Sequence, residues 1–348
     1  MKAVCFESVQ KVSQRDIPDP IIEDSGDAIV QVNLAGLCGS DLHPFFGREL
    51  GIAPGTVMGH EFVGKVVELG AAVKNFQTGD RICSPFTTNC GRCLPCQNGL
   101  TSRCDRGQLF GWREQGTGLH GGQSQYVRVP LADSTLMKIP SNMSDDIALL
   151  LGDNLSTGFF CAEMAGIQPA GVYVVIGCGT VGLLAIQAAK ILGANTVIAV
   201  DPLDSRRQIA RQIGAITCDN LNDVSQLVAD HTGARGADAV MELVGLPNAQ
   251  KMAIDLLSVG GTLSVIGCHC SPNFAFSPAQ AYDKNLTYRT GRCPARHYMG
   301  QLASRLAQQP MNLDWAITHR FGIHDAEAAY ETFAYRKDDC VKAVIEFP

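Results

Sequence analysis

The segment from residue 172 to residue 201, VYVVIGCGTVGLLAIQAAKILGANTVIAVD, constrains the fold more than any other part of the chain. Residues 172–176 form an apolar, β-branched run typical of a buried strand, and residues 181–194 have the composition of a helix. A second apolar run ends the segment, and further runs follow at 237–245 and 261–267. Strands that alternate with helices predict an α/β architecture, a doubly wound parallel sheet flanked by helices.

Within this segment, GCGTVG has the G-x-G-x-x-G spacing, with glycines at Gly177, Gly179 and Gly182. It follows a predicted strand and opens a predicted helix, which is the context in which these glycines let the backbone approach a pyrophosphate. The alternative is a tight strand-to-helix turn with no ligand. The motif and its context favour dinucleotide binding.

Asp201 lies 24 residues after Gly177, at the end of the next predicted strand. An acidic side chain there accepts hydrogen bonds from an adenosine ribose and repels a 2′-phosphate, so we expect NAD rather than NADP. A surface aspartate is the alternative interpretation. Arg206 and Arg207 follow shortly and leave NADP as the less favoured option.

The first 150 residues are β-rich, with short runs at 28–34, 62–70 and 126–130 bounded by glycine or proline. At 348 residues the chain exceeds the size of a typical single core, so two domains are expected. The run at 341–347 predicts a final strand. We expect three parts: a catalytic domain (1–154), a cofactor domain (155–290), and a C-terminal segment (291–348) that returns to the first domain.

Four of the fourteen cysteines fall within fifteen residues, at Cys90, Cys93, Cys96 and Cys104. Four thiolates on one short loop suit a closed, tetrahedral structural zinc site. An iron–sulfur cluster is the rival, but the bacterial ferredoxin run has three residues before its fourth cysteine, and here the gap is seven. Four thiols without metal are the remaining alternative. The spacing favours zinc.

A second candidate metal site combines GLCGSDLH (36–43) with GHEFVG (59–64). Cys38 and His60 are both of a type that binds zinc, and a catalytic zinc has three protein ligands and one open position. The alternative makes Cys38 a core thiol and His60 a surface residue. Both residues lie on glycine-flanked turns of one β-rich domain, which favours the metal site.

Charge and composition exclude several partners. The formal net charge of −6 and a pI of about 5.7 argue against nucleic acid and against an anionic membrane surface. No apolar run approaches the roughly 20 residues of a membrane span. The first ten residues carry Glu7 and Gln10 where a secretion signal has its apolar stretch, so we expect a cytoplasmic protein.

Together, GLCGSDLH, GHEFVG, the four-cysteine loop, GCGTVG and VKAVIEF (341–347) resemble the zinc-dependent medium-chain alcohol dehydrogenases over essentially the whole chain. The resemblance implies a GroES-like catalytic domain and a Rossmann cofactor domain. It also implies Cys38 and His60 as ligands of a catalytic zinc. LLGDNLSTGF (150–159) offers Asp153 as the third ligand, which resembles the bacterial branch of the family.

The resemblance also implies roles for other residues. Glu61 would enter the zinc coordination sphere transiently, and Asp41 would orient His60. Zinc would lower the pKa of the substrate alcohol, and Ser40 would take its proton and pass it through the cofactor ribose to His43 at the surface. The remaining implied contacts are Phe86 in the substrate pocket, Thr157 and Val181 at the nicotinamide, Thr180 within the glycine motif, and Lys342 near the pyrophosphate. A core aromatic, ordinary helix residues and a solvated lysine are the alternatives for these positions.

The resemblance implies an oxidoreductase that transfers a hydride between a small secondary alcohol and NAD, with two zinc ions per chain and a homo-oligomer, a tetramer rather than a dimer. A polyol, sugar-acid or amino-alcohol dehydrogenase is the alternative within the class, since Met241–Gly245 (MELVG) matches a motif of such relatives. A non-catalytic cofactor-binding protein and a thiol redox sensor are the alternatives outside it.

Overall fold

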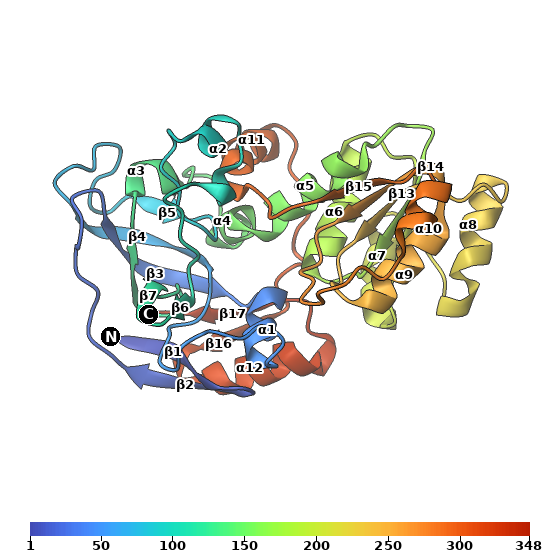
Figure 1. Ribbon diagram of the computed structural model, residues 1–348. Coiled ribbons are helices and arrows are strands. Elements are labelled where there is room, and N and C mark those ends of the chain that lie inside the picture. The colour runs from blue at the N-terminus through green and yellow to red at the C-terminus, as the bar shows by residue number, and fades with distance from the viewer. The chain divides into compact units, whose positions relative to one another are not determined.

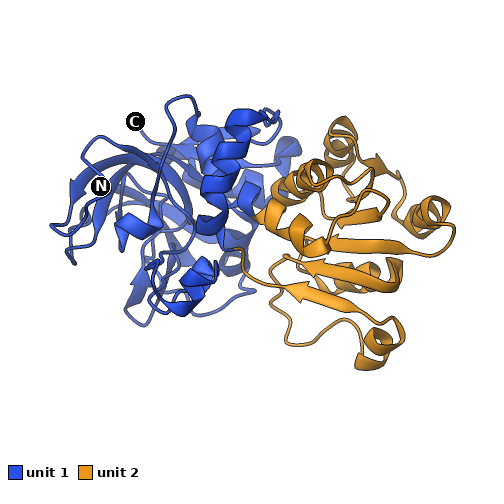
Figure 2. Ribbon diagram, turned by 90° about the horizontal axis from the view of Figure 1, so that it is seen from above, with its two compact units in different colours: residues 1–156, 294–348 blue, residues 157–293 orange.

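The computed structural model describes residues 1–348 and divides them into two compact units. Unit 1 comprises residues 1–156 and 294–348, and unit 2 comprises residues 157–293 (Figure 2). The chain therefore leaves the first unit, completes the second and returns to the first. No helix combines the length and the hydropathy that crossing a bilayer requires.

Unit 1 is built on a seven-stranded sheet of order β16-β17-β3-β4-β5-β9, in which β8 also pairs with β3 (Figure 1). Its strands are β3 (Ala28–Gly36), β4 (Glu61–Leu69), β5 (Arg81–Cys83), β8 (Tyr126–Val129), β9 (Met137–Lys138), β16 (His319–Gly322) and β17 (Ala343–Glu346). Two hairpins accompany it: β1 (Lys2–Ser8) with β2 (Lys11–Asp16), and β6 (Trp112–Glu114) with β7 (Thr117–Leu119). The strands predicted at 28–34, 62–70 and 126–130 are confirmed as β3, β4 and β8.

The helices of unit 1 range from four to fourteen residues in length. They are α1 (Leu42–Phe45), α2 (Leu94–Gln97), α3 (Ala132–Thr135), α4 (Asp145–Gly152), α11 (Ala295–Gln308) and α12 (Ala326–Tyr335), with 3₁₀ turns η1 (Gly39–Asp41), η2 (Thr101–Arg103), η4 (Ile323–Asp325) and η5 (Lys337–Asp339). Helix α5 (Asn154–Ala165) begins in unit 1 and continues into unit 2.

The core of unit 1 joins the two ends of the chain. Strand β17 pairs antiparallel with β3, with Val344 opposite Gly36. Phe62, Tyr330 and Ile345 are buried in one apolar cluster. Burying these side chains together is the main favourable term that fixes the last 55 residues onto this sheet.

Unit 2 is an all-parallel six-stranded sheet of order β12-β11-β10-β13-β14-β15. Its strands are β10 (Val172–Ile176), β11 (Thr196–Val200), β12 (Ile216–Thr217), β13 (Ala237–Glu242), β14 (Leu257–Val265) and β15 (Thr287–Thr290). Its other elements are α6 (Thr180–Ile191), α7 (Asp204–Gln212), η3 (Leu221–Asp223), α8 (Val224–Thr232), α9 (Pro247–Leu256) and α10 (Pro278–Asp283). The doubly wound fold predicted from the alternation is confirmed.

The strand order of unit 2 reverses between β10 and β13. In open parallel sheets of this kind, ligands bind outside the carboxyl ends of the strands at such a reversal. The residues that follow β10 and β13 therefore lie where a cofactor is expected to bind.

Candidate functional site

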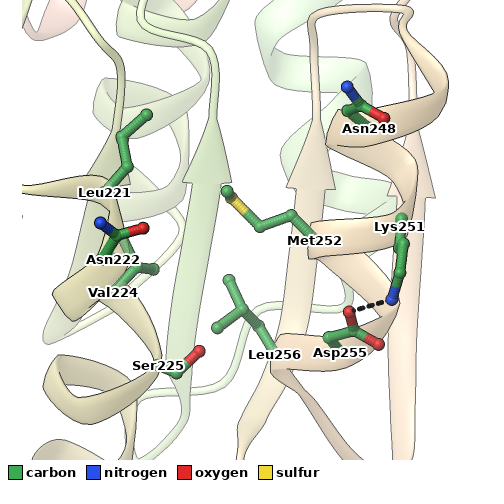
Figure 3. Close-up of a pocket in the computed structure, with 9 residues that line it drawn as sticks. All are labelled: Leu221, Asn222, Val224, Ser225, Asn248, Lys251, Met252, Asp255 and Leu256. Carbon is green, nitrogen blue, oxygen red and sulfur yellow. Dashed lines mark hydrogen bonds and ion pairs between the residues drawn. The ribbon is translucent and has the colours of Figure 1, made fainter.

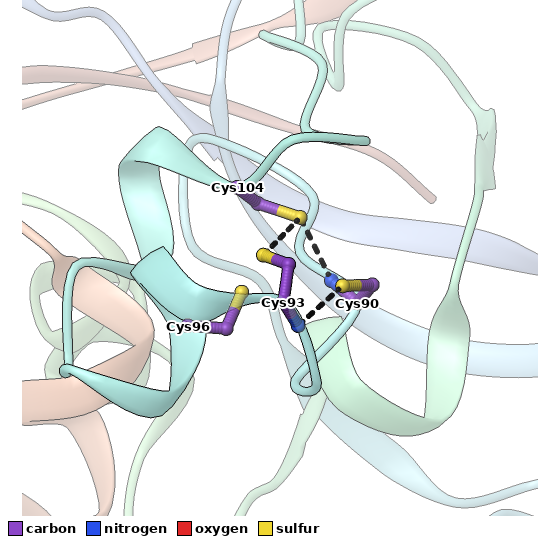
Figure 4. Close-up of side chains that lie close together, drawn as sticks. All are labelled: Cys90, Cys93, Cys96 and Cys104. Carbon is purple, nitrogen blue, oxygen red and sulfur yellow. Dashed lines mark hydrogen bonds between the residues drawn. The ribbon is translucent and has the colours of Figure 1, made fainter.

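The four cysteines predicted as a metal site lie together in unit 1 (Figure 4). The Sγ atoms of Cys93 and Cys104 are 3.8 Å apart. Backbone N–H groups of Cys93 and Cys90 point at the sulfurs of Cys90 and Cys104, at 3.4 Å and 3.2 Å. Such N–H donors stabilise thiolates, the form in which cysteine binds metal.

The spacing of this four-thiol cluster fits a zinc ion. Four sulfurs about 2.3 Å from a tetrahedral zinc lie about 3.8 Å from one another. Burial raises the pKa of the Cys90 thiol, but the backbone N–H groups of Arg92 and Cys93 outweigh it and lower that pKa to about 6. The loop between Cys90 and Cys104 thus contains one ready thiolate before any cation arrives.

The second cluster unites three distant segments of unit 1. Cys38 precedes η1, His60 directly precedes β4, and Asp153 ends α4. Asp153 Oδ2 lies 3.4 Å from Cys38 Sγ and 3.5 Å from His60 Nε2. Ligand atoms bound tetrahedrally to zinc at about 2.0–2.3 Å are about 3.3–3.8 Å apart, so both distances from Asp153 match those between zinc ligands.

The orientation of His60 suits a metal ligand. Its Nδ1 lies 3.1 Å from Asp41 Oδ1, which leaves Nε2 facing Cys38 and Asp153. A carboxylate that accepts a hydrogen bond from the far ring nitrogen fixes the tautomer in which the near nitrogen has a free lone pair. Asp41 itself is buried, and its other oxygen accepts a hydrogen bond from the Cys38 amide.

The charges of the second cluster, Cys38 with His60 and Asp153, favour a bound cation; we refer to this trio as the mixed cluster. Burial, followed by the Asp153 carboxylate, raises the pKa of the Cys38 thiol to about 11. Burial lowers the pKa of His60, but Asp41 and Asp153 outweigh it and raise that pKa well above its ordinary value. Buried acidic groups this close together keep their protons, because their anionic forms repel one another, until a divalent metal ion displaces those protons.

Lys342 and Glu61 form a buried ion pair beside the mixed cluster. Lys342 Nζ lies 2.5 Å from Glu61 Oε2 and donates to the Leu37 carbonyl at 3.1 Å. A Cβ at Gly36 would lie 2.1 Å from that carboxylate, so only glycine leaves room for the pair. Burial lowers the pKa of Lys342, but Glu61 outweighs it and the net shift is upward.

This pair differs from what the sequence suggested for Lys342. Its side chain is only 1% exposed and binds Glu61, whereas the resemblance implied a contact with the pyrophosphate. Asn154 is a further residue that the sequence analysis missed. Its Nδ2 donates to Glu61 Oε1 at 3.0 Å and approaches Asp153 Oδ2 at 3.5 Å, so it links the two carboxylates. Nothing in the sequence separates it from any other asparagine at a helix start.

Ser40 and Phe86 lie beside the mixed cluster. Ser40 Oγ is 3.2 Å from His60 Nε2, and the Phe86 ring meets the His60 ring edge-on with centroids 6.2 Å apart. The surface location expected for His43 is wrong. His43 is only 8% exposed, and its neighbours in α1, Pro44 and Phe45, are buried as well.

The glycine motif in unit 2 forms the turn between β10 and α6. Gly177 has φ +93°, a region that side chains disfavour, and a Cβ at Gly182 would lie 1.8 Å from the Gly177 carbonyl oxygen. A Cβ at Gly179, by contrast, would meet only Arg206 at 3.8 Å. The first and third glycines are therefore required by the turn itself. The second leaves open space at the N-terminus of α6, where a pyrophosphate binds in such folds.

The other residues predicted near this cofactor lie at the starts of two helices. Thr180 and Val181 open α6, and Thr157 lies in the first turn of α5. Thr157 and Thr180 are buried, and Val181 is half-buried.

Asp201 is buried at the carboxyl end of β11, next to the glycine turn. Its Oδ2 accepts a hydrogen bond from the Cys178 amide at 2.8 Å, and its Oδ1 accepts one from the Leu203 amide at 2.9 Å. Arg206 Nη1 lies 3.9 Å from the same carboxylate. Asp201 therefore stabilises the glycine turn, a role that the sequence analysis did not anticipate.

Comparison with known proteins identifies the family. Residues 24–141 match the alcohol dehydrogenase GroES-like domain, and residues 180–308 match the zinc-binding dehydrogenase family. The chain is 40% identical over 342 residues to zinc-type alcohol dehydrogenase B of Aspergillus flavus, covering 96% of this chain and 78% of that one. The chain belongs to the zinc-dependent medium-chain alcohol dehydrogenases.

Two further relatives agree with this alcohol dehydrogenase assignment. The structure of the alcohol dehydrogenase TADH from Thermus sp. ATN1 superposes with a TM-score of 0.94 at 33% identity, covering 100% of both chains. The NADP-dependent isopropanol dehydrogenase of Clostridium beijerinckii is 31% identical over 356 residues, covering 99% of both chains. The predicted combination of a GroES-like and a Rossmann domain is confirmed, and the enzyme is a zinc-type oxidoreductase of alcohols.

Unit 2 of the dehydrogenase also has a pocket of about 380 Å³, and none of its lining residues belongs to the two clusters or to the glycine turn (Figure 3). It lies between η3 with α8 on one side and α9 on the other, with Leu221, Met252 and Leu256 among its apolar side chains. Its lysine, Lys251, forms an ion pair with Asp255 at 2.7 Å. The pocket therefore offers neither a metal ligand set nor an uncompensated charge.

Proposed function

We propose that the chain is an NAD-dependent zinc enzyme that transfers a hydride between a small secondary alcohol and NAD, giving the ketone. The observation that carries this proposal is the mixed cluster of Cys38, His60 and Asp153, with zinc-like spacing between its ligand atoms. The four-thiol cluster takes a second zinc that has no open position. Two zinc ions per chain are therefore part of the proposal.

A zinc ion in the mixed cluster supplies Lewis acidity that lowers the pKa of an alcohol hydroxyl. Asp41 keeps the Nε2 lone pair of His60 directed at the cluster. Glu61, held by Lys342 and Asn154, adds negative charge nearby and is available to approach the metal. These residues set the charge and the orientation of the ligands before any substrate binds.

Ser40 is the proton acceptor in this proposal. Its hydroxyl lies at the mixed cluster, 3.2 Å from His60 Nε2, and a hydroxyl can accept one proton while it donates its own. His43 follows three residues later in α1 and takes the proton onward. Its burial makes it an internal relay group, so a further step carries the proton to solvent.

The nicotinamide cofactor supplies the hydride acceptor, and unit 2 binds it. The open space at Gly179 and the N-terminus of α6 support pyrophosphate binding. Asp201 supports NAD, because its carboxylate disfavours a 2′-phosphate. Arg206 beside Asp201, and the NADP dependence named for the Clostridium relative, are the observations that favour NADP instead.

A panel of primary, secondary and polyhydroxy alcohols, assayed with NAD and with NADP, tests the proposal. We expect the highest kcat/KM for a secondary alcohol with NAD. The isopropanol activity named for the Clostridium relative supports the substrate class. A preference for polyols, sugar acids or amino alcohols would move the enzyme to the alternative within the class. No turnover by protein with both clusters loaded would overturn the proposal.

The variant Asp201→Gly tests the cofactor assignment, with Asp204→Gly as the matched control because Asp204 is an exposed carboxylate on the same segment. We expect the first change to raise KM for NAD about tenfold and to narrow the discrimination against NADP. The control variant should leave both the KM for NAD and the discrimination against NADP unchanged. A wild-type enzyme that already prefers NADP would contradict the role of Asp201.

A homotetramer completes the proposal. Light scattering coupled to gel filtration measures the mass in solution directly, and the chain mass of 37.2 kDa makes a tetramer and a dimer easy to separate. A measured mass that corresponds to a dimer or a monomer would contradict the proposed homotetramer.

A further inference from the structure

The loop after β14 carries two cysteines, Cys268 and Cys270, that belong to neither metal cluster. Both side chains are exposed, and their sulfur atoms lie within 4.8 Å of each other. Most other thiols of unit 2 are buried. Burial raises the pKa of Cys161 to about 12, for example, and a buried thiol of this kind is chemically inert.

His269, the residue between the two cysteines, anchors the loop to the cofactor sheet. Its Nε2 lies 2.7 Å from Glu242 Oε2. Glu242 is fully buried at the carboxyl end of β13, and its other oxygen accepts hydrogen bonds from the amides of Val244 and Gly245 at 2.8 Å and 2.9 Å. The imidazole thus completes the partners of a buried carboxylate.

Glu242 lies where a cofactor is expected to bind. Strand β13 adjoins β10 at the reversal of the strand order, and the glycine turn follows β10. The loop is packed closely here, since a Cβ at Gly245 would lie 2.5 Å from the Cys268 carbonyl oxygen. A change in the backbone at Cys268–Cys270 therefore reaches the turn after β13.

We propose that Cys268 and Cys270 form a redox-active dithiol, and that its closure to a disulfide draws His269 away from Glu242. Closure brings the two sulfurs from their present separation to about 2.05 Å, and His269 is the middle residue of the ring that forms. Its backbone must turn, and the imidazole turns with it. Exposed and strained disulfides are the ones that reduce readily, which suits a reversible switch.

Hydrogen peroxide, or a hydroperoxide of the same class, is the oxidant. One thiolate attacks a peroxide oxygen, the O–O bond breaks, and a sulfenic acid forms while the peroxide is reduced. The second thiol then attacks the sulfenic sulfur, the S–O bond breaks, and water leaves. One S–S bond replaces two S–H bonds, and each hydrogen peroxide yields two water molecules. A dithiol reductant reverses the reaction by exchange.

The sequence around the loop makes the disulfide directly measurable. Lys251 and Lys284 are trypsin sites, and the peptide 252–284 between them contains no other lysine or arginine and no other cysteine. After peroxide treatment and blocking of the remaining thiols with iodoacetamide, we expect this peptide to be unalkylated and about 2 Da lighter than its reduced form. A peptide that carries two alkyl groups, or only sulfinic acid, after that treatment would overturn the proposal.

The consequence for cofactor binding rests on the proposed function and is measured separately, by titration of the holoenzyme with NADH followed by fluorescence. We expect peroxide to weaken NADH binding about threefold or more and dithiothreitol to restore it. The double variant C268S/C270S should lose the response. It keeps the other twelve cysteines of the chain, including the four-thiol cluster and Cys38. A response that persists in it therefore comes from another thiol and contradicts the proposal.

The variant Cys218→Ser serves as the matched control, because Cys218 is a half-buried thiol of the same unit and should leave the response intact. A disulfide that forms without any change in NADH affinity would overturn the coupling to His269 and Glu242. Reduced protein that binds neither NADH nor NADPH would refute the proposed function instead, while the mass of peptide 252–284 would still decide the existence of the dithiol.

Discussion

The two candidate metal clusters of unit 1 are built in opposite ways. The four-thiol cluster draws its ligands from fifteen consecutive residues, 90–104, and all four are of one type. The mixed cluster draws Cys38, His60 and Asp153 from three segments that only the folded chain brings together, and its ligands are of three types.

Their surroundings differ as well. Backbone N–H groups and the neighbouring thiols are the partners of the sulfurs of Cys90 and Cys104. The mixed cluster has buried charged neighbours: the Asp41 carboxylate on the far side of His60, and the Lys342–Glu61 pair. A closed set of four identical ligands is typical of a structural zinc site, whereas ligands of mixed type with hydrogen-bonded supporting partners are typical of a catalytic one.

The variant Cys38→Ser should have the largest effect on activity. A serine hydroxyl is a poor substitute for a thiolate ligand, so we expect kcat/KM to fall by about a thousandfold or more, the several kcal/mol that a Lewis acid contributes. Circular dichroism and the melting temperature should stay near the wild type, because the four-thiol cluster is separate. Unchanged turnover would show that the mixed cluster does not carry the reaction.

The variant Cys93→Ser should produce the reverse pattern. Loss of one ligand from a structural site removes folding free energy, and we expect the melting temperature to fall by roughly 10 °C. The kcat of the remaining folded enzyme should stay within about threefold of the wild type. A large loss of kcat with no change in melting temperature would reverse the roles of the two clusters.

The variant Asp41→Asn tests the support behind His60 and should have a smaller effect. An amide holds the ring less firmly and removes the negative charge, so zinc affinity or kcat should fall by about 10- to 100-fold. The exposed Asp16→Asn variant is the control and should change neither. Metal affinity measured by competition with a chelator separates Asp41 from a merely structural residue.

The smallest effect is a difference in thiol reactivity after both clusters are emptied with a chelator. At pH 7.5 Cys90, with a pKa of about 6, is a thiolate, and Cys38, with a pKa of about 11, is a thiol. Iodoacetamide should therefore modify Cys90 faster, by about 10- to 30-fold, because the larger thiolate fraction of Cys90 outweighs the lower nucleophilicity of its thiolate. Raising the pH toward 11 should narrow the gap, because Cys38 then ionises. Equal rates at pH 7.5 would contradict the electrostatic contrast between the clusters.

The sequence predicted the local features well. The strand–glycine–helix segment from residue 172 and the four-thiol loop are both encoded within short stretches, so spacing and hydrophobic pattern are enough to identify them. Asp153 was reached only through resemblance to a family, because nothing in the residues beside it indicates that α4 ends next to Cys38 and His60.

Long-range partners could not be predicted. The pairing of Lys342 with Glu61 depends on β17 returning to β3, which places residues from opposite ends of the chain in contact. The burial of His43 depends on how a four-residue helix packs. The link between Asp201 and the Cys178 amide depends on the close approach of β11 to the glycine turn. Each of these contacts depends on tertiary packing, and hydrophobic periodicity in the sequence carries no information about it.

Zinc content per chain, measured by mass spectrometry of the purified metal-loaded enzyme and of its Cys38→Ser variant, decides whether the mixed cluster binds a metal ion. We expect about two zinc ions per chain in the wild type and about one in the variant, since only the mixed cluster is disrupted. One zinc ion in both proteins would mean that Cys38, His60 and Asp153 hold no metal, and would contradict the mechanism built on them.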